Sequence, residues 1–226
     1  LGGRVRFCVS GAAPLNPAVA RFFHAAGITI LEGYGMTENC SFTNVTSLDN
    51  LKFGTVGRPA PGVTQKINDD GEIAYRGRNV MKGYYKMPGE TAAVIKKGWL
   101  HTGDLGMVDP EGNLIITGRK KEIIITSGGK NIAPAPLESM ITSSKYINQA
   151  CVVGDTRKHL TALITLDADN IMEYARASGI PGTGVHDLDA HPGIISLIDA
   201  EMARVNAQLA SFESIKRYAI VPEFTI

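Results

Sequence analysis

The segment Gly98–Pro134, GWLHTGDLGMVDPEGNLIITGRKKEIIITSGGKNIAP, decides how the rest of this sequence is interpreted. Two short apolar runs, Leu105–Val108 and Asn113–Thr117, flank the tetrapeptide Asp109–Gly112. Asp, Pro and Gly at such spacing predict a tight turn, because Asp hydrogen-bonds nearby backbone, Pro fixes φ and Gly tolerates a positive φ. The segment therefore predicts a β-hairpin.

This hairpin would bring two charged residues together at its open end. It sets Asp104 roughly opposite Thr117 and Gly118, with Arg119 at the end of the second strand. A carboxylate can accept two hydrogen bonds from a vicinal diol such as that of ribose, and a guanidinium can bind a second acceptor nearby. A plain ion pair at the mouth of the hairpin explains the same charges, so on geometry alone both interpretations stay open.

Length and composition bound the class of protein. The chain has 226 residues, of which 44% are hydrophobic, enough for one large domain or two small ones. The net charge of +1, with acids and bases interspersed, disfavours a nucleic-acid binder. No apolar run approaches the roughly 18 residues of a membrane span, and no signal peptide opens the chain. Three widely spaced cysteines predict neither a disulfide framework nor a zinc site, which indicates a cytoplasmic setting.

Residues 1–50 predict one βαβ unit. The run Val5–Val9 is typical of a strand buried in a parallel sheet. Asn16 and Pro17 are a good helix start, with Gly27 as the terminating residue, and Ile28–Leu31 is a second strand. These residues are interpreted as a slice of an α/β domain.

A glycine-rich turn follows that second strand. Gly33 and Gly35 would let the backbone approach a ligand at the carboxyl end of the sheet. Tyr34 can stack on a flat base, while Thr37 and Glu38 suit phosphate and Mg²⁺. As chemistry alone this is a weak signal, because most such turns are only turns.

The pattern changes twice more along the chain. Residues 51–117 consist of short β runs cut by Gly and Pro, with a hairpin turn at 69–71 and a short helix at 90–95, and they predict a small antiparallel β subdomain. The charged segment GRKKE, Gly118–Glu122, indicates a domain boundary. Beyond it, helices are expected near 136–143, 170–177 and 194–209, and strands near 149–153, 160–166 and 218–221, which together form a compact α+β domain.

Two superficially chemical patterns are rejected. The letters around Gly128 and Gly129 lack the spacing of a phosphate-binding P-loop. The loop VHDLDAHPG holds four residues able to ligate metals, but their spacing fits no standard site; they are His186, Asp187, Asp189 and His191.

Four motifs, in this order, resemble those of the adenylate-forming (AMP-binding) enzyme superfamily: SGAAPL at 10–15, YGMTE at 34–38, WLHTGDLG at 99–106 and GRKKEIIITSGGKNIAP at 118–134. The superfamily includes acyl-CoA synthetases, luciferases and peptide-synthetase adenylation domains. The spelling here is most similar to long-chain fatty acyl-CoA synthetases. The resemblance implies ATP-dependent activation of a fatty acid to an acyl-adenylate and transfer to CoA, with ATP or AMP, Mg²⁺ and coenzyme A as ligands.

The resemblance also implies roles for single residues. Catalytic roles fall to Thr37, to Glu38 through a phosphate-bound Mg²⁺, and to Lys121 as the hinge of a lid domain. Gly128 and Gly129 would lie along the CoA thiol tunnel. Nucleotide binding falls to a larger set, in which the first three residues flank the adenine opposite the tyrosine: Gly11, Ala12, Ala13, Tyr34, Gly35, Thr37, Asp104 and Arg119.

By the same resemblance, residues 1–117 are the C-terminal part of the large AMP-binding domain, and 118–226 are the lid, cut before the motif that carries its catalytic lysine. The family's Ser/Thr/Gly-rich phosphate loop is also absent, and Lys216 does not replace the missing lysine. The sequence is therefore expected to be a fragment that is inactive alone. The parent enzyme is expected in the cytoplasm, with peripheral association with the inner face of a membrane left open.

Three alternatives remain at this stage. An aryl- or medium-chain acyl-CoA ligase differs mainly in an acyl pocket that the family places upstream, so chain length rests on motif spelling. A peptide-synthetase adenylation domain is disfavoured, because it usually carries Asp at the position of Lys121. The third alternative is a non-catalytic nucleotide-binding module. In that case the protein itself would lack the phosphate loop and the catalytic-lysine motif, rather than carry them outside this sequence.

Overall fold

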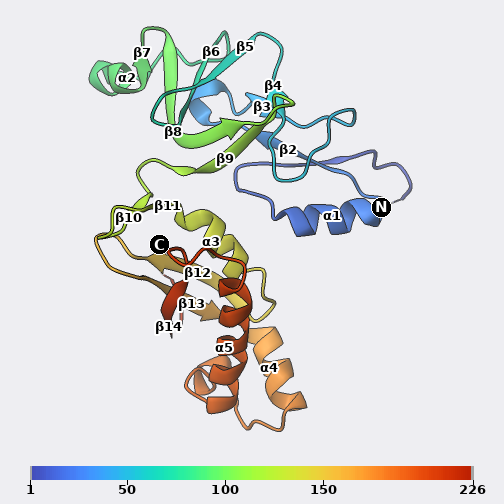
Figure 1. Ribbon diagram of the computed structural model, residues 1–226. Coiled ribbons are helices and arrows are strands. Elements are labelled where there is room, and N and C mark those ends of the chain that lie inside the picture. The colour runs from blue at the N-terminus through green and yellow to red at the C-terminus, as the bar shows by residue number, and fades with distance from the viewer. Residues whose placement is uncertain (1, 225–226) are drawn as a thin grey trace. The chain divides into compact units, whose positions relative to one another are not determined.

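The computed structural model describes residues 2–224. The chain folds into two compact units. Unit 1 is Leu1–Lys121 and unit 2 is Glu122–Ile226, so the division falls inside the GRKKE segment. Both units combine helices with sheets (Figure 1). The predicted fold class, α/β followed by α+β, is confirmed.

Unit 1 opens with the predicted βαβ unit. Strand β1 (Cys8–Ser10) pairs in parallel with β2 (Ile30–Tyr34), and helix α1 (Pro17–Ala25) connects them. The side chain of Asn16 caps the helix by accepting a 2.8 Å hydrogen bond from the Ala18 N–H. Two short strands, β3 (Asn44–Val45) and β4 (Arg58–Pro59), extend the sheet in antiparallel fashion.

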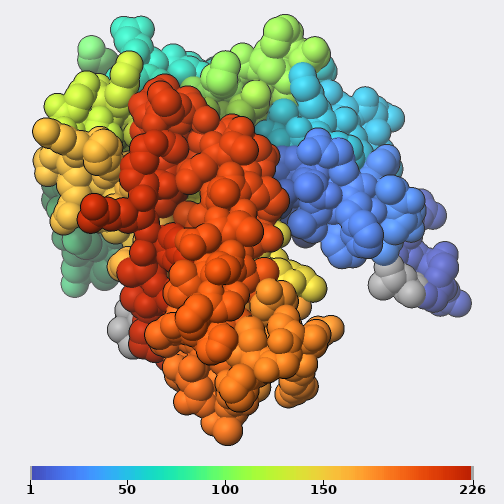
Figure 2. Space-filling view, turned by 60° about the horizontal axis from the view of Figure 1, so that its bottom comes forward, coloured from blue at the N-terminus to red at the C-terminus, as the bar shows by residue number. Residues whose placement is uncertain are grey.

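The expectation that the first strand is buried is wrong. Val5, Phe7 and Val9 are 49%, 45% and 64% exposed. Among the described residues β1 has a neighbouring strand on one side only, namely β2, so its apolar side chains are left on the surface. Helix α1 also exposes a large apolar side chain, since Phe22 is 68% exposed. These first elements belong to the blue surface in Figure 2.

The second sheet of unit 1 is antiparallel, as predicted, with the order β5-β6-β8-β7 and β9 paired to β8. Its interior is formed by Ile73, Tyr75 and Leu114, which are fully buried. The remaining elements of the unit are η1 (Thr37–Asn39), β5 (Val63–Ile67), β6 (Glu72–Gly77), α2 (Pro88–Val94), β7 (Ile95–Lys96), β8 (Trp99–Val108) and β9 (Leu114–Arg119).

The predicted hairpin is β8 and β9. Its turn is closed by Asp109, whose Oδ1 accepts a 2.7 Å hydrogen bond from the Asn113 N–H, and Gly112 has a φ of +87°. The register shifts between Leu105 and Gly106, with an extra residue, Thr117, on β9. This bulge places Asp104 directly opposite Arg119, one or two residues beyond the position expected without it.

Unit 2 contains a three-stranded sheet with helices packed against it, and a separate two-stranded sheet formed by β10 and β11 (Figure 1). β12 is antiparallel to β13, and β13 is parallel to β14. Fully buried residues of the core include Ile141, Leu160, Ile164, Ile171 and Ile198. The elements are β10 (Ile124–Ile125), β11 (Asn131–Ile132), α3 (Pro134–Ile141), β12 (Ile147–Val153), β13 (Leu160–Leu166), α4 (Ala168–Ala177), η2 (Val185–Asp187), α5 (Pro192–Asn206) and β14 (Ile215–Ile220).

In the part of the chain that the structure describes, no helix combines the length and apolarity needed to cross a bilayer.

Candidate functional site

Asp104 is the centre of a polar cluster in unit 1. Its Oδ2 accepts a 2.5 Å hydrogen bond from the Tyr34 hydroxyl, and its Oδ1 lies 3.1 Å from Arg119 Nε. The three residues come from β8, β2 and β9, with Tyr34 seventy residues upstream of Asp104. Asp104 is 7% exposed, whereas the Arg119 side chain is 67% exposed. The structure thus brings together the acid, the arginine and the tyrosine that the sequence singled out.

The backbone around Asp104 is fixed by local hydrogen bonds. The Asp104 N–H donates to Thr102 Oγ1 at 3.0 Å, and Thr102 Oγ1 donates to the Ile73 carbonyl at 2.8 Å. Gly103 between them has a φ of +74°, which favours glycine. The HTGD motif therefore fixes the direction of the carboxylate through the adjoining strand β6.

Tyr34 is held by a buried network that the sequence did not reveal. Its ring centroid lies 6.1 Å from that of Tyr75, whose hydroxyl donates to Asn44 Oδ1 at 2.5 Å. The Asn44 amide donates to Gln65 Oε1 at 2.8 Å and to the Gly57 carbonyl at 3.1 Å. These partners lie far apart in sequence, so no local pattern could have found them.

The Tyr34 hydroxyl stays protonated and donates its hydrogen bond to Asp104. Burial, together with the hydrogen bond to Asp104 and the negative charge of that carboxylate, raises the pKa of Tyr34 well above its ordinary value of 10.0. The phenol therefore stays protonated and continues to donate at any physiological pH. Stacking of the ring on a base, as expected from the sequence, stays a prediction.

The loop after β1 lies at the same edge of the sheet as Tyr34. Ser10 is in register with Glu32, and a Cβ built on Gly11 would be 3.2 Å from the Gly33 carbonyl oxygen. The exposed residues Gly11–Ala13 thus follow β1 where Gly33 and Tyr34 end β2. This is the juxtaposition that parallel strands produce at their carboxyl ends.

Thr37 and Glu38 begin the short helix η1 directly after this turn. Thr37 is exposed, and Glu38 is half-buried with its Oε1 accepting a 2.7 Å hydrogen bond from the Tyr84 hydroxyl. Gly35 permits the tight return of the chain, because a Cβ there would lie 2.3 Å from the Ser41 carbonyl carbon. The sequence analysis did not single out Tyr84.

The other residues singled out by the sequence lie elsewhere. Lys121 is exposed at the end of unit 1. Gly128 and Gly129 occupy the exposed turn between β10 and β11 in unit 2, where Gly129 has a φ of +73°. The turn is closed by a 3.0 Å hydrogen bond from the Thr126 N–H to the Lys130 carbonyl.

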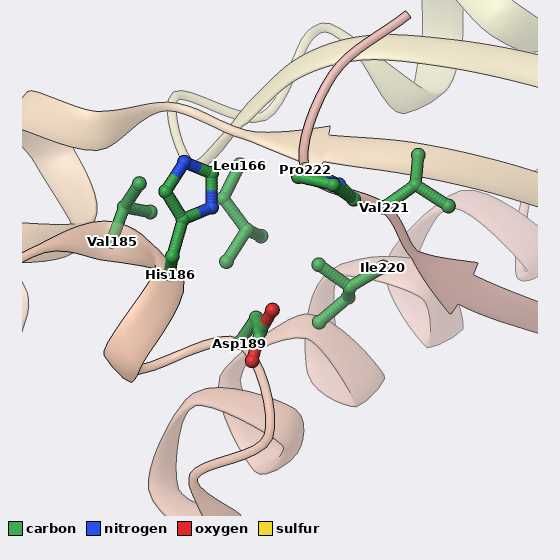
Figure 3. A pocket seen from close by; sticks show the side chains of 7 residues that line it. All are labelled: Leu166, Val185, His186, Asp189, Ile220, Val221 and Pro222. Carbon is green, nitrogen blue, oxygen red and sulfur yellow. The ribbon is translucent and has the colours of Figure 1, made fainter.

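The His- and Asp-containing loop of unit 2 uses its side chains as caps. Asp187 accepts a 2.5 Å hydrogen bond from Thr183 Oγ1, and His191 Nδ1 accepts a 3.1 Å bond from the Gly193 N–H at the start of α5. His186 and Asp189 line a pocket of about 10 Å³ (Figure 3), room for a single water molecule. Within residues 2–224 no group of three or more His, Cys, Asp or Glu is arranged to hold a metal ion.

A second acid, Glu72 of the adjoining strand β6, binds the backbone next to Asp104. The sequence analysis did not find it. It is 7% exposed; its Oε1 accepts a 3.0 Å hydrogen bond from the Gly103 N–H, and its Oε2 lies 2.9 Å from His101 Nδ1. Lys120 Nζ is 3.6 Å from the same carboxylate. Burial alone would raise the pKa of Glu72, but the hydrogen bonds from His101 and Gly103 and the charge of Lys120 outweigh it, so the pKa is lowered.

We expect Glu72 to make unit 1 sensitive to acid. A carboxylate with a lowered pKa in the folded state stabilises the fold above its ordinary value of 4.5, and this stabilisation is lost as the pH falls through the folded-state pKa. Glu72→Gln should therefore lower stability at neutral pH and flatten its fall below about pH 5. Trp99, the only tryptophan, lies in unit 1, so its fluorescence during urea unfolding reports on that unit.

The control for this measurement is Asp49→Asn, which removes an exposed carboxylate from the same unit. It should leave the pH dependence as it is in the unsubstituted chain. Equal pH profiles for Glu72→Gln and Asp49→Asn would contradict the role given to Glu72.

Comparisons with known proteins identify the family of the chain. Residues 1–85 match the AMP-binding enzyme family, and residues 121–224 match the AMP-binding enzyme C-terminal domain. The chain is 44% identical over its whole length to the long-chain-fatty-acid–CoA ligase FadD15 of Mycobacterium bovis, and 38% identical to the peroxisomal long chain acyl-CoA synthetase 6 of Arabidopsis thaliana. It spans 38% and 35% of the length of these two relatives.

Solved structures show the same fold. The O-succinylbenzoate coenzyme A synthetase MenE of Bacillus subtilis, in complex with ATP and magnesium ion, is 27% identical with a TM-score of 0.73, over 97% of this chain and 43% of that one. An ATP-bound chimera, RpMatB-BxBclM B1, is 31% identical with a TM-score of 0.74, over 97% of this chain and 42% of the chimera. Because residues 1–85 and residues 121–224 match two successive domains of the same family, the chain belongs to the AMP-binding enzyme family.

Proposed function

We propose that this chain is part of a long-chain fatty acid–CoA ligase and that the Asp104 cluster binds the ribose of ATP. The observation that carries the proposal is the pairing of Asp104 with both Tyr34 and Arg119. Each carboxylate oxygen has more than one lone pair, so a carboxylate that already accepts these two donors can still accept two hydroxyl protons from a vicinal diol. Arg119, with most of its side chain exposed, is suited to contact the nucleotide as well.

The remaining nucleotide contacts would come from the sheet edge beside Tyr34. In the proposal Gly11–Ala13 flank the adenine, with Tyr34 on its opposite face. Gly35 also binds the nucleotide, and Thr37 contacts phosphate oxygen. The small, exposed residues Gly11–Ala13 support this, because a planar base can approach the backbone closely where side chains are small. The exposed Thr37 hydroxyl at the start of η1 is available as a phosphate donor.

The residues present fit a nucleotide-bound Mg²⁺ rather than a free ion. Mg²⁺ in nucleotide sites is usually held by one or two carboxylates, with phosphate oxygens and water completing its shell. Glu38 offers one half-buried carboxylate at the end of the same turn. When bound, the ion would neutralise charge on the phosphates at the reacting phosphorus.

The proposed reaction has two steps. A fatty acid carboxylate oxygen forms a bond to the α-phosphorus of ATP while the bond from that phosphorus to pyrophosphate breaks, giving an acyl-adenylate. The sulfur of CoA, having lost its proton to solvent, then bonds to the acyl carbon, and AMP leaves. Lys121 would act as the hinge between the steps, and Gly128 and Gly129 would line the path of the thiol.

The names of the relatives favour a long-chain acid over the aryl- or medium-chain alternative. None of the proposed site residues forms an acyl pocket. The choice between a long-chain acid and an aryl- or medium-chain acid is therefore tested on the protein that contains this chain, with a series of fatty acids of increasing length. A maximum for aryl or medium-chain acids would overturn the long-chain assignment. We further propose that this protein acts in the cytoplasm.

The test of the proposed function is made on the 226-residue chain. Calorimetry should show binding of AMP and weaker binding of UMP, since the site is proposed to enclose an adenine. Formation of AMP from ATP with palmitate and CoA should be undetectable, because the sequence contains neither the family's phosphate loop nor its C-terminal lysine motif. Equal or absent binding of the two nucleotides would overturn the nucleotide site, and robust turnover would overturn the assignment of catalysis to the two missing motifs.

A further inference from the structure

We propose that Tyr84 is a positioning residue that fixes the carboxylate of Glu38 for a nucleotide-bound metal ion. The inference rests on the proposed function, because it concerns the same nucleotide site. It adds to that site a residue from the segment Met81–Tyr84, which the sequence did not single out.

Two hydrogen bonds join Glu38 to this segment. The Tyr84 hydroxyl donates to Glu38 Oε1 at 2.7 Å, and the Glu38 carbonyl accepts a 2.8 Å bond from the Met81 N–H. The side chain and the backbone of Glu38 are thus both held by residues more than forty positions away in the sequence. The bond to Oε1 turns the carboxylate in one direction and leaves lone pairs on both oxygens for further ligands.

Tyr84 is itself held by the start of α2. Its N–H donates to Thr91 Oγ1 at 2.9 Å, and Thr91 Oγ1 donates to the Met87 carbonyl at 2.9 Å. The preceding residue, Gly83, packs closely against Thr91, since a Cβ there would lie 2.7 Å from Thr91 Cγ2. A residue fixed in this way can restrict the rotamers of Glu38, which a mobile surface tyrosine could not do.

The neighbouring Tyr85 offers a matched comparison. It has the same side chain but is 86% exposed, whereas Tyr84 is half-buried. Tyr84→Phe removes only the hydroxyl that contacts Glu38, and Tyr85→Phe removes a hydroxyl from the adjacent position. Any general effect of losing a phenol in this segment should appear in both variants.

A glutamate that is oriented before binding loses less rotamer freedom when it meets the metal. Groups that orient a metal ligand typically contribute about 10- to 100-fold in metal affinity. A residue that only supports the fold would instead affect all ligands of the site alike. The affinity for ATP with and without Mg²⁺ separates these cases.

The experiment measures ATP affinity of the 226-residue chain by calorimetry, once with Mg²⁺ and once with EDTA, together with AMP affinity and thermal melting. The unsubstituted chain and Tyr85→Phe should bind ATP more tightly with Mg²⁺ than with EDTA. Tyr84→Phe should lose about 10-fold of this gain. Its AMP affinity, its ATP affinity in EDTA and its melting temperature should match those of Tyr85→Phe. Glu38→Gln should remove the gain altogether.

An undiminished Mg²⁺-dependent gain in Tyr84→Phe overturns the inference, as does an equal loss for AMP and for ATP in EDTA. If the unsubstituted chain binds AMP but shows no Mg²⁺-dependent gain, the inference is wrong while the proposed nucleotide site stands. If it binds no AMP, the proposed function itself fails, and the inference falls with it.

Discussion

Replacing Asp104 by Asn is expected to weaken AMP binding to the chain by about 10- to 100-fold, since hydrogen bonds to a charged acceptor contribute roughly 1.5–3 kcal/mol and each 1.4 kcal/mol is about tenfold. The carboxylate has two acceptor oxygens, one facing the Tyr34 hydroxyl and one facing Arg119 Nε. An amide has a single acceptor oxygen and turns an NH₂ group toward one of these donors. A ribose diol would then lose the anionic acceptor for one of its hydroxyl groups.

The fold should survive this substitution. Asn has nearly the volume of Asp, and its amide oxygen can still accept the hydrogen bond from the buried Tyr34 hydroxyl. The backbone bonds at Thr102 and Gly103 do not involve the Asp104 side chain. Urea unfolding followed through Trp99 should therefore show unit 1 folded under the conditions of the binding measurement.

Asp69→Asn is the matched control, because Asp69 is an exposed carboxylate in the β5–β6 turn of the same unit. It makes the same change of charge and should leave AMP affinity unchanged at a fixed salt concentration. If calorimetry gives the same affinity for Asp104→Asn as for Asp69→Asn, Asp104 and Arg119 are a plain ion pair at the mouth of a hairpin. The ribose assignment would then be wrong.

The parts of this site that sequence reasoning reached are those set by local chemistry. The β8–β9 turn depends on Asp109, which bonds to a residue four positions away, and on the positive φ of Gly112. Because both are local features, the approach of Asp104 to Arg119 could be predicted. The bulge at Thr117 could not, because the residues of the turn do not determine the register of the strands beyond it. A Cβ on Gly106 would lie 2.7 Å from the Ile115 carbonyl oxygen, which shows how tightly β8 and β9 approach beside the bulge.

The parts that sequence reasoning missed are contacts across long sequence separations. Tyr75, Asn44 and Glu72 carry no local pattern that distinguishes them from other strand residues, yet they hold Tyr34 and Gly103 in place. The wrong prediction of a buried β1 has a related cause. An apolar run such as Val5–Val9 shows which side chains favour burial, but not which segment covers them.

The second large effect is expected at Gly35, where substitution by Ala should destabilise unit 1 by roughly 3 kcal/mol, as overpacking against a rigid backbone does. A Cβ at this position would lie 2.3 Å from the Ser41 carbonyl carbon and 2.5 Å from the Phe42 nitrogen. Both are backbone atoms, so no side chain can rotate away to make room.

The loop that faces Gly35 has little freedom to move. Cys40 and Ser41 already have φ values of +59° and +57°, which L-residues rarely adopt. The Ser41 N–H donates to the Met36 carbonyl at 2.8 Å, and the Thr43 N–H donates to the Tyr34 carbonyl at 3.0 Å. Moving this loop to admit a methyl group would break one of these bonds or increase the strain at both residues.

Gly89→Ala is the control for the loss of a glycine. Gly89 lies in the first turn of α2, where an added Cβ would have nothing within 4 Å, and Ala is a better helix former than Gly. Urea unfolding followed by Trp99 fluorescence should give a lower midpoint for Gly35→Ala and an equal or higher midpoint for Gly89→Ala. Because Tyr34 and Thr37 flank Gly35, the first variant should also lose AMP binding while the second keeps it. Equal midpoints for the two variants would mean that the turn adapts to a side chain, and that its close approach to Ser41 does not hold the site in shape.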